Sequence, residues 1–119
     1  MNYRRFGRLG WQVAEVGFGT WGMGGWSGSD DDQSRAALRR GLEMGCNFLD
    51  TALAYGNGRS EQLIRDVLAD WTGARPIIAT KIPPKNGRWP ARRSTPLDAA
   101  FPPDYVREAT ERSLTNLGV

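Results

Sequence analysis

The sequence predicts an α/β fold in which short strands alternate with amphipathic helices. Short apolar runs bounded by glycine or proline indicate buried strands. The segments between them carry apolar residues at helical spacing over about 10–15 residues, a pattern typical of parallel βαβ units. At 119 residues, the chain is expected to form a single domain. Strands are expected at 13–20, 46–50 and 77–81, and helices at about 33–44, between Ser60 and Gly73, and between Pro102 and Gly118.

The segments outside these units are expected to form a hairpin and two loops. Residues 3–16 contain two short strand patterns around Gly7 and Gly10, which predict a small hairpin. Residues 21–29 hold four glycines and predict a flexible loop. A second long loop, rich in proline and arginine, is expected between the third strand and Phe101.

Residues that favour helix ends mark the predicted helices. Asp30 and the two aspartates after it suit the N-cap and first turn of the first helix, and Gly45 suits its end. Ser60 is predicted to be the N-cap of the second helix. Proline at the start of the third helix and Gly118 at its end follow the usual asymmetry of helix termini.

Composition excludes several classes of function. The net charge of +3 is mild, and no aromatic residues are interleaved with a long basic stripe, so nucleic-acid binding is not expected. Six basic residues between Arg75 and Arg93 form either a solvated loop or an anion-binding surface. The chain has no histidine and one cysteine, Cys46, so no metal site is expected. No apolar run approaches the ~20 residues of a membrane span, and a cytoplasmic location is expected.

The segment from Gly17 to Gly22 fits the G-x-G-x-x-G pattern of dinucleotide-binding folds. In those folds the third glycine lies in the first turn of a helix that faces the pyrophosphate. Here more glycines follow, and the helical pattern starts only near Asp30. A glycine-rich loop between strand and helix is therefore the favoured interpretation.

Asp50, Tyr55 and Lys81 form the strongest candidate site. Asp50 and Lys81 each end a predicted strand, and Tyr55 lies in the loop after the first of them. A neighbouring ammonium stabilises a phenolate and lowers the pKa of a phenol, and a carboxylate can orient that ammonium. The trio could therefore exchange a proton with a carbonyl or alcohol oxygen. The alternatives are structural: a helix cap for Asp50, a loop aromatic for Tyr55 and a solvated strand end for Lys81.

The chain resembles the N-terminal part of an aldo-keto reductase. The residues that carry the resemblance are Leu9-Gly10, Val16 to Gly22, Asn47 to Ala52, Tyr55-Gly56, Gly58, Ser60-Glu61, Ile78 to Lys81, Ser113-Leu114 and Leu117-Gly118. The pattern of the residues alone leaves open a doubly wound sheet or an eight-stranded β/α barrel, and a complete barrel needs about 250 residues. The resemblance implies the barrel: residues 1–119 would supply the hairpin and about three βα units, with the C-terminal half absent.

The resemblance also implies the chemistry. The family transfers hydride between NADPH (NADP+) and an aldehyde or ketone, with Tyr55 as general acid, Lys81 beside it and Asp50 paired with Lys81. Positions Gly19, Thr20, Trp21 and Asp50 would contact the cofactor. Trp21, Trp26 and Tyr55 would contact the small carbonyl substrate, together with Trp89 as a further apolar wall. Ordinary packing is the alternative role for the tryptophans.

One catalytic group that the resemblance implies is missing. The family has a fourth catalytic residue, a histidine after the fourth strand, and these 119 residues contain none. The expected function is therefore that of an NADPH-dependent reductase, with this chain a truncated and inactive portion. The alternative is a non-catalytic half-barrel that self-associates through exposed barrel edges or binds a partner. Members of the family also serve as channel-associated subunits, so the resemblance leaves open a binding role for the parent protein.

Overall fold

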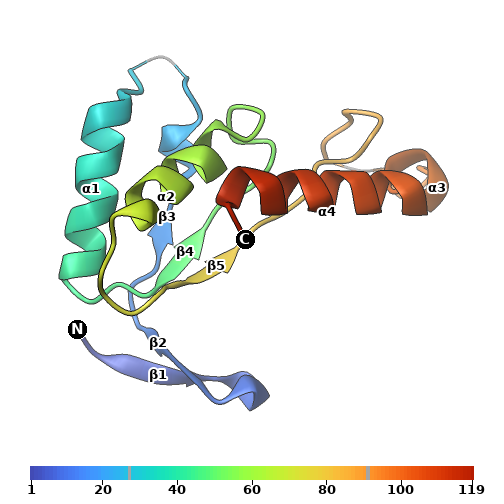
Figure 1. Ribbon diagram of the computed structural model, residues 1–119. Helices are drawn as coiled ribbons and strands as arrows, with labels where there is room; N and C mark the ends of the chain where they lie inside the picture. Colours follow the sequence, from blue (N-terminus) through green and yellow to red (C-terminus); the bar gives the residue numbers. More distant parts are fainter. Residues whose placement is uncertain (27, 91) are drawn as a thin grey trace.

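The computed structural model describes residues 1–26, 28–90 and 92–119, which form a small hairpin and a parallel sheet covered by helices (Figure 1). Residues 27 and 91, which belong to the two predicted loops, lie outside the described residues. The hairpin consists of β1 (Tyr3–Phe6) and β2 (Trp11–Ala14), which pair antiparallel. This confirms the hairpin predicted for residues 3–16.

The parallel sheet has the order β3-β4-β5. Its strands are β3 (Phe18–Gly19), β4 (Phe48–Asp50) and β5 (Ile77–Ala79). The registers pair Gly19 with Asp50 and Asp50 with Ala79, so all three strands end at the same level. The strands follow one another in sequence and in space with helices between them, which confirms the prediction of parallel βαβ units.

Three long helices cover the sheet, with α2 lying between α1 and α4 (Figure 1). They are α1 (Asp31–Glu43), α2 (Arg59–Ala69) and α4 (Pro103–Leu117). A short helix, α3 (Leu97–Ala100), precedes α4, and two 3₁₀ turns, η1 (Gly7–Leu9) and η2 (Trp21–Met23), interrupt the loops. Because η2 is only three residues long and α1 begins at Asp31, no helix starts at Gly22 as a dinucleotide fingerprint would require.

Helix α1 begins and ends at the residues that its sequence predicts. The Asp30 carboxylate accepts a hydrogen bond from the backbone N–H of Gln33 at 2.7 Å, which satisfies one of the free donors of the first turn. Gly45, directly after the C-cap residue Met44, has a φ of +92°, which ends the helix at low cost for a residue without Cβ.

Helix α2 differs from its prediction at both ends. Gly58, not Ser60, is the N-cap residue, and Ser60 lies inside the first turn with its hydroxyl buried among threonines. The helix ends at Ala69, before the predicted end at Gly73, so Trp71 lies beyond it. Trp71 still packs against the core, and its indole N–H donates to the carbonyl oxygen of Ala74 at 3.1 Å.

The core lies between the sheet and the helices. It is built around the fully buried side chains of Leu38 on α1, Leu49 on β4 and Ile64 on α2. Leu117 extends it to α4. Burying a side chain of this size contributes about 1.5–3 kcal/mol, so this cluster is the main force that holds the strand ends beneath the helices.

Asn47 attaches the hairpin to the sheet at the end where the parallel strands begin (Figure 1). Its side-chain oxygen accepts a hydrogen bond from the backbone N–H of Ala14, and its amide donates to the carbonyl of Gln12, both at 2.8 Å. The hairpin therefore closes the end of the sheet opposite to the one where Asp50 lies.

Within the described ranges, no helix has both the length and the apolar character needed to cross a bilayer.

Candidate functional site

The candidate site lies where the three parallel strands end. Trp21 follows β3, Asp50 ends β4, and Lys81 comes two residues after β5. Two backbone hydrogen bonds continue the pairing past the strands, from Thr51 N–H to Ala79 O at 2.8 Å and from Leu53 N–H to Lys81 O at 2.9 Å. These bonds hold the segment after β4 against the segment after β5, so the side chains that follow the strands share one rim.

Asp50 and Lys81 form an ion pair at this rim. The Lys81 ammonium donates to Asp50 Oδ1 at 2.7 Å and to the carbonyl oxygen of Thr51 at 2.7 Å. Both side chains are half-exposed, at 50% each. An exposed pair of this kind contributes little to stability, about 0–1 kcal/mol, so its main effect is to fix the position of the ammonium.

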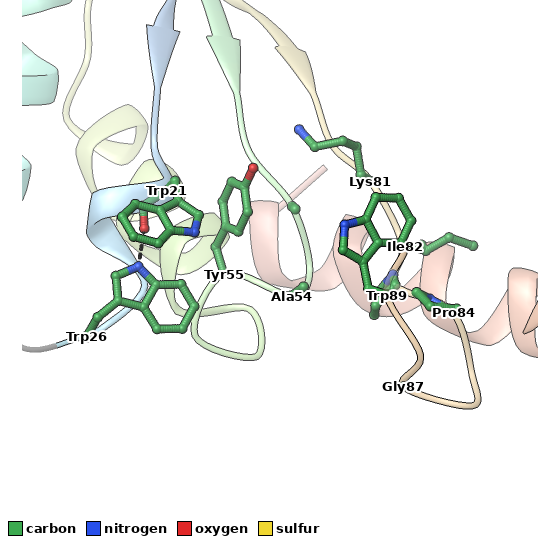
Figure 2. Close-up of a pocket in the computed structure, with 11 residues that line it drawn as sticks. Trp21, Trp26, Ala54, Tyr55, Lys81, Ile82, Pro84, Gly87 and Trp89 are labelled. Carbon is green, nitrogen blue, oxygen red and sulfur yellow. Dashed lines mark hydrogen bonds between the residues drawn. The ribbon is translucent and has the colours of Figure 1, made fainter. Parts of the chain in front are cut away.

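Tyr55 lies beside that ammonium. The turn after β4 brings it there, with the Tyr55 N–H donating to the carbonyl of Ala52 at 2.9 Å. The Lys81 nitrogen lies 5.4 Å from the centroid of the Tyr55 ring, within the range of a cation–π interaction. In Figure 2 the hydroxyl of Tyr55 and the amino group of Lys81 point toward each other. The structure therefore brings together the three residues of the predicted catalytic trio.

An apolar cavity of about 540 Å³ lies beside Tyr55 and Lys81, which both line it (Figure 2). Trp21 and Trp26 line one side, with ring centroids 5.6 Å apart and an interplanar angle of 34°. The Trp26 indole N–H donates to the Trp21 carbonyl oxygen, which holds the Trp26 ring against the backbone of Trp21. Trp89 and Pro84 line the opposite side. The predicted substrate-contacting tryptophans thus border the same cavity as Tyr55 and Lys81.

The residues predicted to contact the cofactor differ in how accessible they are to a ligand. Trp21 is 64% exposed, and a Cβ added to Gly19 would meet no described atom within 4 Å. The surface beside Asp50 is therefore open to a ligand at Gly19 and at Trp21. Thr20, in contrast, is fully buried. Its hydroxyl donates to the backbone oxygen of Asp50 at 3.0 Å and accepts a hydrogen bond from Ser60 at 2.7 Å. The Thr20 side chain therefore faces away from the cavity, and a contact between Thr20 and a cofactor stays a prediction.

Sequence reasoning missed the two residues that lie behind the strand ends. Ser60 and Glu61, in the first turn of α2, are both fully buried although both are polar. The sequence favours Ser60 as a helix cap and indicates no separate role for Glu61. The one available signal was their position: a serine and a glutamate that immediately precede the apolar stripe of α2.

Among the described residues, no group of three or more potential ligands could hold a metal ion.

Comparisons with known proteins agree with this architecture. The sequence pattern of the Aldo/keto reductase family matches residues 15–119. Aldo-keto reductase YhdN of Bacillus subtilis is 36% identical over 85 residues, which cover 68% of this chain and 25% of that protein.

Solved structures match over the whole chain. The holo form of aldo-keto reductase AKR11C1 from Bacillus halodurans superposes with a TM-score of 0.75 and 29% identity, covering 100% of this chain and 37% of that one. An aldo-keto reductase from Klebsiella pneumoniae in complex with NADPH superposes with a TM-score of 0.70 and 27% identity, covering 99% and 36%.

The chain thus spans a quarter to about two fifths of the length of these relatives. The matched structures are β/α barrels, which confirms the predicted fold: a hairpin and three βα units from the N-terminal portion of such a barrel. Together, the family match over residues 15–119 and the fold show that this chain belongs to the aldo/keto reductase family of oxidoreductases.

Proposed function

We propose that the protein of which these residues form a part reduces an aldehyde or ketone to an alcohol with NADPH as the reductant. The observation that carries the proposal is the position of the Lys81 ammonium, 2.7 Å from Asp50 Oδ1 and 5.4 Å from the centroid of the Tyr55 ring. A phenol beside an ammonium, at the mouth of an apolar cavity, suits proton transfer to a carbonyl oxygen.

Each member of the trio has a separate role in this proposal. Tyr55 donates its hydroxyl proton to the carbonyl oxygen as the carbonyl carbon is reduced, which leaves a phenolate. Lys81 stabilises that negative charge because its ammonium is held beside the ring. Asp50 keeps the ammonium in place through the 2.7 Å hydrogen bond. A proton from solvent then restores the phenol for the next turnover.

The residues present fit a nicotinamide cofactor at the end of β3 and β4. Gly19 leaves open space beside the backbone, and the exposed Trp21 ring offers a flat apolar surface. Asp50 uses Oδ1 for Lys81, and no donor in the described part of the chain is bonded to Oδ2, which leaves an acceptor for an amide or hydroxyl group. Bound NADPH would supply the hydride. The NADPH complex of the Klebsiella pneumoniae relative supports the choice of this cofactor.

The cavity suits a small carbonyl compound with an apolar substituent. Its walls are mainly aromatic side chains and prolines. Two members of the trio also line it, and they contribute the Tyr55 hydroxyl and the Lys81 ammonium. Trp21, Trp26 and Tyr55 would contact the substrate, with Trp89 on the far side.

The buried free thiol of Cys46 is compatible with a reducing compartment, and we propose a cytoplasmic location.

Coupled turnover tests the proposal. NADPH oxidation, followed by the loss of its absorbance, is measured with aromatic and aliphatic aldehydes and ketones for the whole protein and for Tyr55→Phe. Phenylalanine keeps the ring and removes the acid, so we expect NADPH binding to persist and turnover to fall by about 10²–10⁴-fold. Equal turnover in the two proteins, or no turnover in either, would refute the proposed function.

We propose that the 119-residue chain alone has little or no reductase activity. It spans 36–37% of two solved relatives and lacks the histidine that the resemblance implies.

A non-catalytic role is the second candidate for the isolated chain, because β3 and β5 are edge strands of the described sheet. Open edges favour self-association or partner binding. A stable monomer in light scattering would count against this role, and robust turnover by the isolated chain would contradict the first statement.

A further inference from the structure

Two consecutive buried polar residues lie behind all three strand ends that carry the candidate site. Ser60 and Glu61 occupy the first turn of α2, and both are 0% exposed. A buried polar group is costly unless it is hydrogen-bonded. The partners that satisfy these two residues are side chains at the ends of β3, β4 and β5 and on α4.

Ser60 joins the ends of β3 and β4 through hydroxyl groups. Its Oγ donates to Thr20 Oγ1 at 2.7 Å, and Thr20 in turn donates to the backbone oxygen of Asp50 at 3.0 Å. Because the Ser60 proton is used in this bond, the 3.0 Å contact with Thr51 Oγ1 has Thr51 as the donor. The hydrogen bonds therefore run in one direction, from Thr51 through Ser60 and Thr20 to the carbonyl group of Asp50.

Glu61 joins the end of β5 to helix α4. Its Oε1 accepts a hydrogen bond from Thr80 Oγ1 at 2.6 Å, and its Oε2 accepts one from the side-chain amide of Asn116 at 2.9 Å. Among the described residues, no cationic side chain forms an ion pair with Glu61. The carboxylate lies in the first turn of α2, where the helix dipole favours negative charge. Its two oxygens thus depend on Thr80 and Asn116.

The three threonines of this network are each adjacent in sequence to a residue of the candidate site. Thr20 precedes Trp21, Thr51 follows Asp50, and Thr80 precedes Lys81. Successive residues of an extended chain point to opposite faces. Beyond β4 and β5, where the chain stays extended, a threonine that is held toward α2 therefore directs its neighbour away from α2. At Asp50 and Lys81, the site side chains meet on that other side in an ion pair.

We propose that Ser60 and Glu61 are positioning residues of the candidate active site. They set the spacing of Asp50 and Lys81 through the threonine next to each, and Ser60 also holds the end of β3 through Thr20. The expected effect of these residues on turnover rests on the function proposed above. Their expected effect on the strand ends does not depend on that function. The hydroxyl groups of the network act on the backbone, so removing one displaces the neighbouring site residue without removing a reacting group.

The decisive variant is Thr80→Val, which has nearly the same shape as threonine but lacks the hydroxyl that donates to Glu61. Misplacing a catalytic group by about 1 Å can cost about 100-fold in rate, so we expect kcat to fall by about 10- to 100-fold with KM for NADPH little changed. Thr80→Ser keeps the hydroxyl and is expected to restore turnover. Thr110→Val is the matched control, because its hydroxyl is exposed and, among the described residues, donates only to the carbonyl of Val106 within α4.

Amide hydrogen exchange by NMR tests the same inference without any turnover. In Thr80→Val, the amides of Thr51 and Leu53, which bond to Ala79 O and Lys81 O, are expected to exchange about tenfold faster. The amide of Leu42 in α1 reports on the rest of the fold and is expected to stay unchanged. An effect on overall stability alone would speed exchange in α1 as well and would leave kcat per folded molecule unchanged.

The outcomes separate this inference from the proposed function. If the unsubstituted protein turns over no carbonyl compound, the proposed function fails, while the exchange rates still decide the positioning role. If Thr80→Val does not fold, Ser60→Ala carries the test, with faster exchange expected at Thr20, whose amide bonds to Asp50 O at 2.9 Å. Unchanged exchange at the strand ends, or unchanged kcat in a working reductase, would overturn the inference.

Discussion

Gly56 packs directly against the backbone of Gly24, so the loop that carries Tyr55 and the loop that carries the cavity tryptophans meet without a side chain between them. A Cβ added to Gly56 would lie 2.2 Å from the Gly24 carbonyl oxygen, well inside any real contact distance. Gly56 also has a φ of +64°, which favours glycine for a second, independent reason. The position of Tyr55 therefore depends on a glycine beside it.

Gly56→Ala is expected to destabilise the protein by at least about 2 kcal/mol, because strain at positive φ and the overlap with Gly24 add together. Gly10→Ala is the matched control, since Gly10 has a φ of +73° but nothing within 4 Å of an added Cβ. Urea unfolding of both variants separates the two effects. Equal losses of stability would show that the close approach of the two loops contributes nothing.

Lys81→Met is expected to remove activity while leaving the free energy of unfolding within about 1 kcal/mol, because the ion pair with Asp50 is half-exposed. Turnover is expected to fall by about 10²–10⁴-fold, since the ammonium beside Tyr55 is lost. Arg40→Met, which breaks the exposed pair with Glu43, is the control and is expected to change neither quantity appreciably. Wild-type turnover in Lys81→Met would contradict the role given to Lys81.

Trp21→Ala is expected to raise the KM of carbonyl substrates by about tenfold with a smaller change in kcat, because it removes an apolar wall of the cavity but no proton donor. Steady-state kinetics with an aromatic aldehyde give both constants. Trp11→Ala, in the hairpin and stacked on Phe6, removes an equally large exposed ring outside the cavity and serves as the control. A KM that rises equally in both variants would argue against a substrate contact.

Asp30→Ala is expected to lower the stability of the protein by about 1 kcal/mol, because the N-cap hydrogen bond to Gln33 is lost at the start of α1. Asp32→Ala also removes one negative charge at the start of α1. In the described part of the chain Asp32 pairs only with Arg35 on the surface, so a smaller loss of stability, a few tenths of a kcal/mol, is expected. Thermal unfolding of the two variants compares a cap with a surface charge. A larger loss for Asp32→Ala would contradict the cap assignment.

Local rules explain which parts of the fold could be predicted from the sequence. The cap at Asp30 and the stops at Gly45 and Gly118 depend on residues within one turn of the helix end, so the sequence alone identifies them. The trio of Asp50, Tyr55 and Lys81 was located for a similar reason. Strand ends are visible in the apolar pattern, and parallel strands bring their ends to one rim. The chemical roles of the trio stay predictions.

Long-range hydrogen bonds explain what the sequence could not predict. Ser60 has the residue type of a helix cap, but its hydroxyl bonds to Thr20, 40 residues away, and Gly58 takes the cap position. The role of Asn47 in holding the hairpin depends on Ala14 and Gln12, at separations of 33 and 35 residues. Such partners leave no local periodicity. They follow from the tertiary fold, which overrides local preference.

The ion pair between Asp50 and Lys81 has a consequence for how the site assembles. Its partners are 31 residues apart, and the bond from Thr20 to Asp50 spans 30. Each contact joins a βα unit only to the next, so each closes a loop of moderate length, and loop-closure entropy grows with the logarithm of that length. Each βα unit can therefore dock on the one before it at a moderate entropic cost, without a contact to a more distant part of the chain.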